Sequence, residues 1–264
     1  MTLILQRLAL GAYGLATVLA FTSLMLKRRP TFRLVPYLAL LGLLSHLVVF
    51  LGVAGSRGHL PFMSLNGALS LLTILAVSSY LYGCWRHGLH VLGVIMLPLA
   101  LLLNLVSGTL PQRALPVAEG FKHTLLWLHV MVSSLGVSAL GLTFTFSIIY
   151  LYQEKALKAK RPRRFFLRLP SLTGCDRALH VSLVVGFALL TLGLVMATVW
   201  SANFLGTFRV WQNKAETLAL LAWLIFALVL YARLVQGWRG RKTALLVIAG
   251  FATMMLRLVG GSLL

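Results

Sequence analysis

The chain has 264 residues, of which 59% are hydrophobic and 11% are charged. Soluble domains carry about a quarter charged residues, so this composition excludes an ordinary soluble enzyme and indicates a helical membrane protein. A formal net charge of +20 would suggest nucleic acid binding in a soluble chain, so the distribution of this charge along the sequence decides its meaning.

Eight apolar runs are long enough for the 20 or so helical residues that cross a bilayer. In chain order they cover residues 3–26, 34–54, 62–84, 89–108, 123–152, 178–202, 215–236 and 243–262. We therefore predict an all-α polytopic membrane protein with eight transmembrane helices, forming a single integral membrane domain over residues 1–264. The first span is expected to stay as an anchor, because its basic cluster follows it and its apolar run is too long for a cleavable signal.

Most of the 24 Lys and Arg residues fall in the first, third, fifth and seventh connections. An excess of basic residues in short loops marks the cytoplasmic side, so both termini are predicted on the outer (periplasmic) side. Topology then explains the charge. The lipid bilayer is an expected partner and nucleic acid is not.

Cys84 and Cys175 both fall on the predicted cytoplasmic side, where thiols stay reduced. No C-x-x-C-H motif is present, so the chain is not expected to attach haem covalently to itself.

Histidine is the main chemical signal within the apolar runs. His46, His129 and His180 fall inside predicted spans, and His59 precedes the third span. A polar side chain inside the bilayer is by default a functional-site hypothesis. The alternative is a histidine that hydrogen-bonds across helices, and the sequence leaves both open.

Depth along the helices separates these histidines into two groups. At 1.5 Å per residue, His129 lies about 9 Å and His46 about 12 Å below the outer end of its span. The two are therefore expected to be able to flank one cofactor. His180 enters from the cytoplasmic end and lies about 15 Å from His129 along the membrane normal. Because metal–imidazole bonds are about 2 Å long, His180 belongs to a second, inner site if it binds a cofactor.

Ser133 and Gly136 follow His129 on the same helical face. Small residues allow another helix or a flat macrocycle to approach closely, and the sequence does not distinguish the two. Neutral imidazole is a common haem ligand, whereas zinc usually takes three or four grouped protein ligands, so structural zinc is disfavoured.

The segment "LHVMVSSLGVSALGL" resembles the helix of CcsA-type cytochrome c assembly proteins that begins with an outward-facing histidine. The similarity continues from "DRALHVSLVVGF" at residue 176 through "GWRGRKTALLVIAGF" at residue 251, and "GHLPFMSLNGALSLL" resembles the family's preceding segment. The region most similar to the family is therefore 62–264.

The family's tryptophan-rich outer loop is only partly matched. Trp211, Lys214, Glu216 and Thr217 fit its pattern, whereas Gln212 and Asn213 replace the expected aspartate–proline portion. Phe204 stands at a tryptophan position, Tyr231 stands at a histidine position, and the family's final outer histidine has no counterpart. The chain is most similar to the shorter eight-helix branch that includes the YpjD and HemX-like proteins.

The resemblance implies a multi-pass protein of the bacterial inner (plasma) membrane. It would handle haem and assist c-type cytochrome biogenesis without being an enzyme. The implied cofactor is b-type haem, bound non-covalently, with His129 and His46 as iron ligands. Its wider set of cofactor-binding residues is His129, His46, His59, His180 and Trp211, with Arg113, Lys122 or Arg209 available for the propionates. The implied partners are haem, other cytochrome c assembly proteins and apocytochrome.

An alternative function is a membrane regulator or scaffold of a haem-biosynthesis enzyme that acts through the basic connection Gln153–Arg177. A transporter ranks last, because charges on discontinuous spans would favour it and no acid lies at mid-membrane. A hydrolytic enzyme is disfavoured, because no nucleophile, base and orienting acid fall in one layer.

Overall fold

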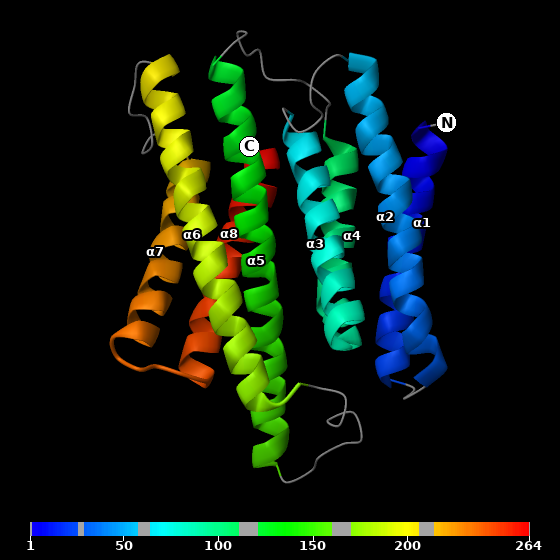
Figure 1. Cartoon of the computed structure of the whole chain (residues 1–264), viewed down its shortest axis with the longest axis vertical. Helices are drawn as coiled ribbons and strands as arrows, with labels where there is room; N and C mark the ends of the chain where they lie inside the picture. The colour runs from blue at the N-terminus through cyan, green and yellow to red at the C-terminus, as the bar shows by residue number, and fades with distance from the viewer. Residues whose placement is uncertain are drawn as a thin grey trace. The chain divides into compact units, whose positions relative to one another are not determined.

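A computed structural model describes residues 2–25, 29–57, 64–110, 121–159, 170–205 and 214–263. These residues form eight α-helices and one short 3-10 helix (Figure 1). The elements are α1 (Thr2–Met25), α2 (Arg29–Arg57), α3 (Leu65–His87), η2 (His90–Leu92), α4 (Gly93–Thr109), α5 (Phe121–Lys158), α6 (Leu172–Leu205), α7 (Lys214–Leu234) and α8 (Arg241–Leu263).

The predicted all-helical architecture is confirmed, and each predicted span corresponds to one α-helix, except that the fourth begins with the 3-10 helix η2 before α4. Seven of the described helices are long and apolar enough to cross a membrane. Helix α8 is not among the seven, and its described part carries Arg241, Lys242 and Arg257. The eighth crossing and the side on which the termini lie therefore stay predictions.

Helix α5 is the longest element. Its 38 residues span about 57 Å at 1.5 Å per residue, nearly twice the ~30 Å hydrocarbon thickness of a bilayer. Its last turns carry Lys155 and Lys158, so the helix continues beyond the apolar run into the basic connection.

The helices divide into two compact units, α1–α4 and α5–α8, and each is described by itself. In the first unit, α1 and α3 each pack against both α2 and α4. In the second, α5 and α7 each pack against both α6 and α8. Consecutive helices of a unit run in opposite directions (Figure 1). Each unit is therefore a ring of four antiparallel helices.

In the first unit, the Tyr13 ring of α1 packs directly against Gly42 of α2. The Tyr13 side chain is fully buried, and a Cβ atom at Gly42 would lie 2.6 Å from its Cε1. Only a residue without a side chain leaves room for the ring there, so Gly42 sets the distance between the two helices.

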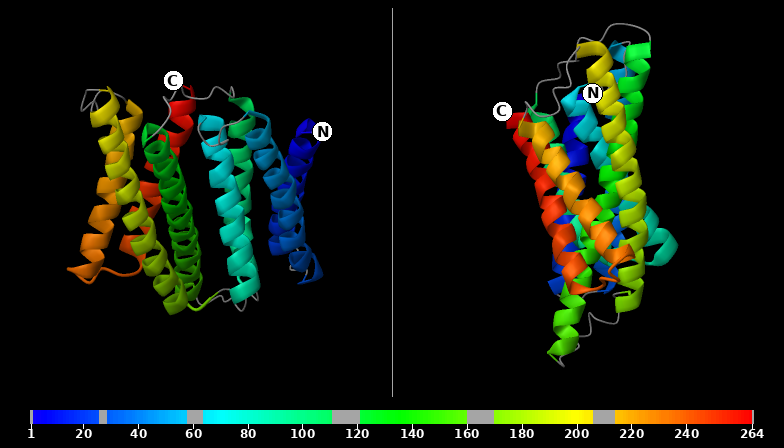
Figure 2. Two further views of the ribbon diagram at one scale, coloured as in Figure 1. Left: turned by 45° about the horizontal axis from the view of Figure 1, so that its top comes forward. Right: turned by 90° about the vertical axis from the view of Figure 1, so that its left-hand side faces the viewer.

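Close backbone contact joins α5 to α6 in the second unit, where the two helices lie side by side over most of their length (Figure 2). A Cβ atom at Gly136 would lie 2.9 Å from the backbone nitrogen of Leu190. One at Gly186 would lie 2.8 Å from Cγ of Leu140, and one at Gly193 would clash with Ser133 Oγ. Gly136 thus admits the neighbouring helix α6, so for this residue the structure shows which of the two groups that the sequence left open approaches it.

Replacing Gly136 by Ala is expected to destabilise the protein, even though Ala has the higher helix propensity by about 1 kcal/mol. The added methyl group meets the α6 backbone and forces the helices apart, at a cost of about 1–3 kcal/mol. Thermal unfolding of the purified protein in detergent measures the change.

Gly141→Ala is the matched control for this prediction, because it makes the same substitution in the same helix. Its Cβ atom would lie 3.8 Å from the Phe251 ring, an ordinary contact. We expect Gly141→Ala to leave the melting temperature unchanged or raise it. Equal melting temperatures for the two variants would contradict the close contact at Gly136.

Candidate ligand site beside His129

His129 lies in α5, about 12 Å along the helix from Phe121. Its side chain is half-buried, and Nδ1 lies 2.7 Å from the backbone carbonyl oxygen of Gly193 in α6. A carbonyl oxygen only accepts hydrogen bonds, so Nδ1 carries the proton and donates it. In the neutral ring the lone pair is then on Nε2, which makes no hydrogen bond to any residue that the structure describes.

This arrangement combines the two roles that the sequence allowed for His129. One ring nitrogen links α5 to α6, and Ser133 Oγ lies 3.4 Å from the same nitrogen. The other nitrogen keeps a lone pair. A histidine that ligates a metal usually donates its second ring nitrogen to a carbonyl or carboxylate in this way, which fixes both the tautomer and the ring orientation.

A cavity of about 280 Å³ lies beside His129 within the second unit. This volume is close to the lower end of the range of about 300–1,000 Å³ that is typical of small-molecule sites. Its wall is mostly apolar or aromatic and is built from all four helices of the unit. The lining residues are Leu126, His129, Ser133, Val137, Leu190, Leu194, Ala197, Thr198, Trp200, Ser201, Glu216, Ala219, Ala222, Trp223, Met254 and Arg257.

One aromatic wall of the cavity is held rigidly. Trp223 Nε1 donates a hydrogen bond of 2.9 Å to Thr191 Oγ1 of α6. The Trp223 ring stacks on Phe187, with centroids 5.6 Å apart. The indole is therefore fixed in place and presents apolar surface to the cavity.

Two opposite charges also line the cavity. Glu216 lies in the first turn of α7, and Arg257 lies two turns before the end of α8. A helix N-terminus favours an anion, so Glu216 stands at a helix end that stabilises it, whereas Arg257 lies too far from the end of α8 to gain from the helix dipole. The sequence analysis assigned Arg257 no role, although an arginine inside an apolar run is itself a signal of function.

The residues present fit a haem group in chemical terms. The cavity offers an imidazole with a lone pair, an apolar and aromatic wall, and a cation, which correspond to the iron, macrocycle and carboxylates of haem. Zinc would need further grouped ligands, and among the described residues the cavity lining holds no cysteine, no second histidine and only Glu216 as a carboxylate.

His46 belongs to α2 in the first unit and is only 5% exposed. Its ring meets that of Tyr13 edge-on, with centroids 6.2 Å apart. Neither His46 Nδ1 nor Tyr13 Oη has a hydrogen-bond partner among the described residues. Buried polar atoms without a partner are uncommon and call for an explanation. A ligand is one such explanation, and the pairing of His46 with His129 on one iron stays a prediction.

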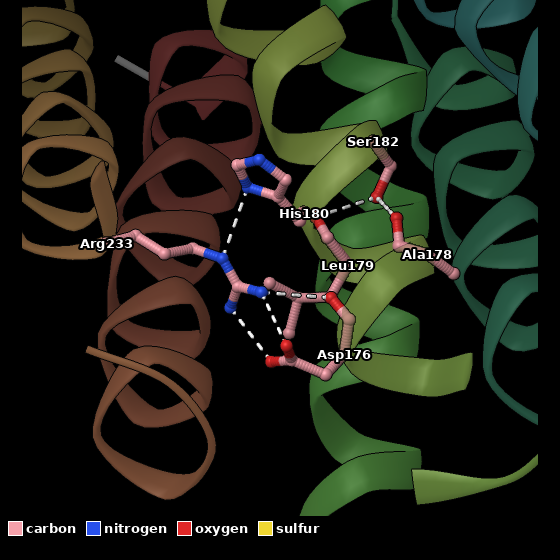
Figure 3. A network of polar contacts seen from close by, with 6 residues as sticks. All are labelled: Asp176, Ala178, Leu179, His180, Ser182 and Arg233. Carbon is pink, nitrogen blue, oxygen red and sulfur yellow. Dashed lines mark hydrogen bonds and ion pairs between the residues drawn. The ribbon is translucent and has the colours of Figure 1, made fainter. Parts of the chain in front are cut away.

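His180 lies at the opposite end of the second unit, about 20 Å along α6 from Gly193. Arg233 of α7 donates a hydrogen bond of 3.2 Å from Nε to His180 Nδ1 (Figure 3). The same guanidinium donates to both carboxylate oxygens of Asp176, at 2.9 and 2.7 Å, and to the Asp176 backbone oxygen at 3.1 Å. The Arg233 side chain is only 6% exposed and that of Asp176 is 22% exposed, so this partly buried network joins α6 to α7.

The hydrogen bond from Arg233 occupies the lone pair on Nδ1 of His180, which a metal ion would need for ligation. Because a guanidinium only donates, Nδ1 of His180 accepts, and the neutral ring carries its proton on Nε2. The inner haem site suggested for His180 stays a prediction, and in this arrangement the histidine acts as a link between helices. Sequence reasoning missed the network, yet Asp176 and Arg233 occupy the same predicted membrane side on consecutive spans, which was the available signal.

Known proteins resemble this chain over most of its length. The sequence profile of the family described as "Cytochrome C assembly protein" matches residues 34–264. The chain belongs to this family. The match contains the region 62–264, and the prediction that this region is the part most similar to the family stays a prediction.

Individual members of the cytochrome c assembly family are similar at moderate identity. A protein named cytochrome c biogenesis protein CcsA from Guillardia theta is 30% identical over 77% of this chain and 73% of its own length. CcsA from Chlamydomonas reinhardtii is 31% identical over 78% of this chain and 59% of its own length. CcsA from Gloeothece citriformis is 27% identical over 87% of both chains. The chain thus spans about three fifths to nine tenths of the length of these relatives.

Several predicted site residues of this family member lie outside the described residues. These are His59, Trp211, Arg113 and Arg209, and the side chain of Lys122 is not described either. Their assignments stay predictions. The assignment to the YpjD and HemX-like branch also stays a prediction.

Replacing Asp176 by Asn is expected to lower the stability of the protein by at least about 1.5 kcal/mol, because Arg233 loses a charged hydrogen-bond partner in a buried position. Thermal unfolding in detergent measures the loss. Glu154→Gln is the matched control, since it breaks the pair with Lys158, whose side chain is 68% exposed, and exposed pairs of this spacing contribute only about 0.3–0.5 kcal/mol. Equal losses of stability in the two variants would show that the Asp176–Arg233 contact contributes no more than an exposed ion pair.

Proposed function

We propose that this chain is a multi-pass membrane protein that binds haem non-covalently and assists the biogenesis of c-type cytochromes, without itself being an enzyme. Membership of the cytochrome c assembly family supports the pathway. The names of its relatives, which are cytochrome c biogenesis proteins, support it further. The expected membrane is the bacterial inner membrane.

The observation that carries the haem proposal is the state of His129. Its Nδ1 is committed to Gly193, so the ring is held in one tautomer with the lone pair on Nε2, and it lines a cavity with apolar walls. An isolated core histidine needs only the hydrogen bond. A histidine that also lines a cavity is prepared for a ligand with an electron-pair acceptor.

Bound haem would supply an iron centre that accepts a nitrogen lone pair, and His129 would hold it through Nε2. The protein residues supply the surroundings. The Gly193 carbonyl orients the His129 ring. The Trp223 side chain, held by its stacking on Phe187, provides a fixed apolar wall of the cavity.

His46 is the proposed second iron ligand. Its buried Nδ1 has no partner among the described residues, and a histidine in this state loses solvation without gaining a hydrogen bond. Ligation would offset that cost. This part of the proposal is separate from the role of His129 and has its own test.

Purified wild-type protein loaded with haem is expected to show a Soret band, and His129→Ala is expected to lose most of it because the axial nitrogen is removed. Absorption spectra at matched protein and haem concentrations measure the loss. His87→Ala is the control, because His87 is exposed at the end of α3 and lies outside the cavity lining. A wild-type protein without a Soret band after haem addition would contradict the proposal.

Two further variants separate ligation from helix packing. His129→Asn keeps a side-chain N–H for the Gly193 carbonyl but has no imidazole, so it should fold normally and still lose the band. His129→Gly with added free imidazole should regain it. If His129→Asn binds haem as the wild type does, His129 is a structural residue and not a ligand.

His46→Ala is expected to leave a Soret band that is shifted and weaker, since one of two imidazole ligands is lost and His129 remains. Low-temperature electron paramagnetic resonance of the ferric protein checks this, because bis-imidazole iron is low-spin and loss of one ligand gives a high-spin signal. His90→Ala serves as the control, because the His90 ring bonds to Cys84 Sγ at 2.9 Å within α3 and η2. An unchanged low-spin signal in His46→Ala would remove His46 from the ligand set.

A further inference from the structure

Arg257 is the least expected member of the cavity wall. It lies in α8 within an apolar run, lines the cavity and is half-buried. Its guanidinium makes no hydrogen bond or ion pair with any residue that the structure describes. A charged group withdrawn from water is costly unless it is paired and hydrogen-bonded, and within a membrane protein such a group marks a functional site by default.

The charge of Arg257 is balanced only at a distance. Glu216 is the acid of the same cavity, and the two side chains attract each other electrostatically. They do not approach within ion-pair distance among the described contacts, and Glu216 is exposed. Glu216 therefore offsets part of the electrostatic cost, while the five N–H donors of the guanidinium stay available within the cavity wall.

Arg257 also acts on the same space as His129. The Arg257 and His129 side chains line one cavity, and the positive charge of Arg257 interacts electrostatically with the His129 ring. A ligand that fills this cavity meets a nitrogen lone pair and a cation together. The matching ligand carries an electron-pair acceptor and an anionic group on the same molecule.

We infer that Arg257 is the anion-binding residue of this cavity and that it takes a carboxylate of the porphyrin whose iron His129 would ligate, an inference that rests on the proposed haem binding. The planar fork of a guanidinium pairs with a carboxylate through two parallel hydrogen bonds. A lysine gives only a point charge. This inference gives the role to a residue of α8, and the assignments of Arg113, Lys122 and Arg209 stay predictions.

The test uses the full chain in detergent or lipid nanodiscs and four probes. These are iron protoporphyrin IX, metal-free protoporphyrin IX and the dimethyl ester of each. The esters keep the macrocycle and remove the negative charges, and the metal-free forms remove ligation by His129. Absorption titrations measure the iron forms, and quenching of tryptophan fluorescence measures the metal-free forms.

In the wild type, each acid is expected to bind at least about tenfold more tightly than its ester, the effect of one charge-assisted contact. Arg257→Gln should abolish this difference for both the iron and the metal-free pair. Arg257→Lys should retain part of it, which also covers the case in which the glutamine variant folds poorly. The control Arg239→Gln removes the same charge from an exposed position of the same unit and should retain the full difference.

The outcomes separate this inference from the proposed function. If Arg257→Gln and Arg257→Lys keep the wild-type difference between acid and ester, Arg257 does not bind the carboxylate, whether or not His129 ligates iron. If the difference depends on Arg257 but His129→Ala does not weaken binding of the iron forms, the anion site stands and haem ligation fails. If no porphyrin binds to the wild type, both are overturned.

Discussion

The hydrogen bond from His129 to the Gly193 carbonyl is the interaction on which the candidate site depends. It forms only because Ser133, Gly136 and Gly193 let α5 and α6 approach to backbone contact. The same contact that stabilises the helix pair therefore sets the tautomer of the imidazole. A larger residue at any of these positions would move the ring as well as the helices, so packing and ligand chemistry are coupled in one place.

Charge is placed at the two ends of the second unit in different ways. At one end Arg233 is saturated by Asp176 and His180, and its bidentate pair acts as a fixed link between α6 and α7. At the other end Arg257 and Glu216 attract each other without a direct contact. Both arginines carry a cost of burial, but among the described residues only Arg233 has hydrogen-bond partners within the protein. Under the proposed function, the end of the unit at Arg257 is the one that receives the ligand.

The sequence predicted the helices well because apolar run length is a local property, and each predicted span corresponds to one α-helix, with η2 added at the start of the fourth. It also identified His129, since a histidine inside such a run is conspicuous. It did not predict the Asp176–Arg233–His180 network or the place of Arg257 in the cavity, because both depend on which helix faces which. The ambiguity at Gly136 had the same origin, since a small residue reports a close approach but not the approaching group.

The residues that differ from the family pattern in the outer loop can be compared with the charged residues that line this cavity. Gln212 and Asn213 stand where the pattern that this chain resembles has an aspartate–proline portion, so this loop lacks that acid, whereas Glu216 lies at the start of α7. Arg257 of α8 lines the same cavity. Under the proposed function, the ligand's charge is recognised by residues of packed helices. Helix-borne groups are held more precisely than groups on a loop, so a chain with a reduced loop motif can keep a defined site.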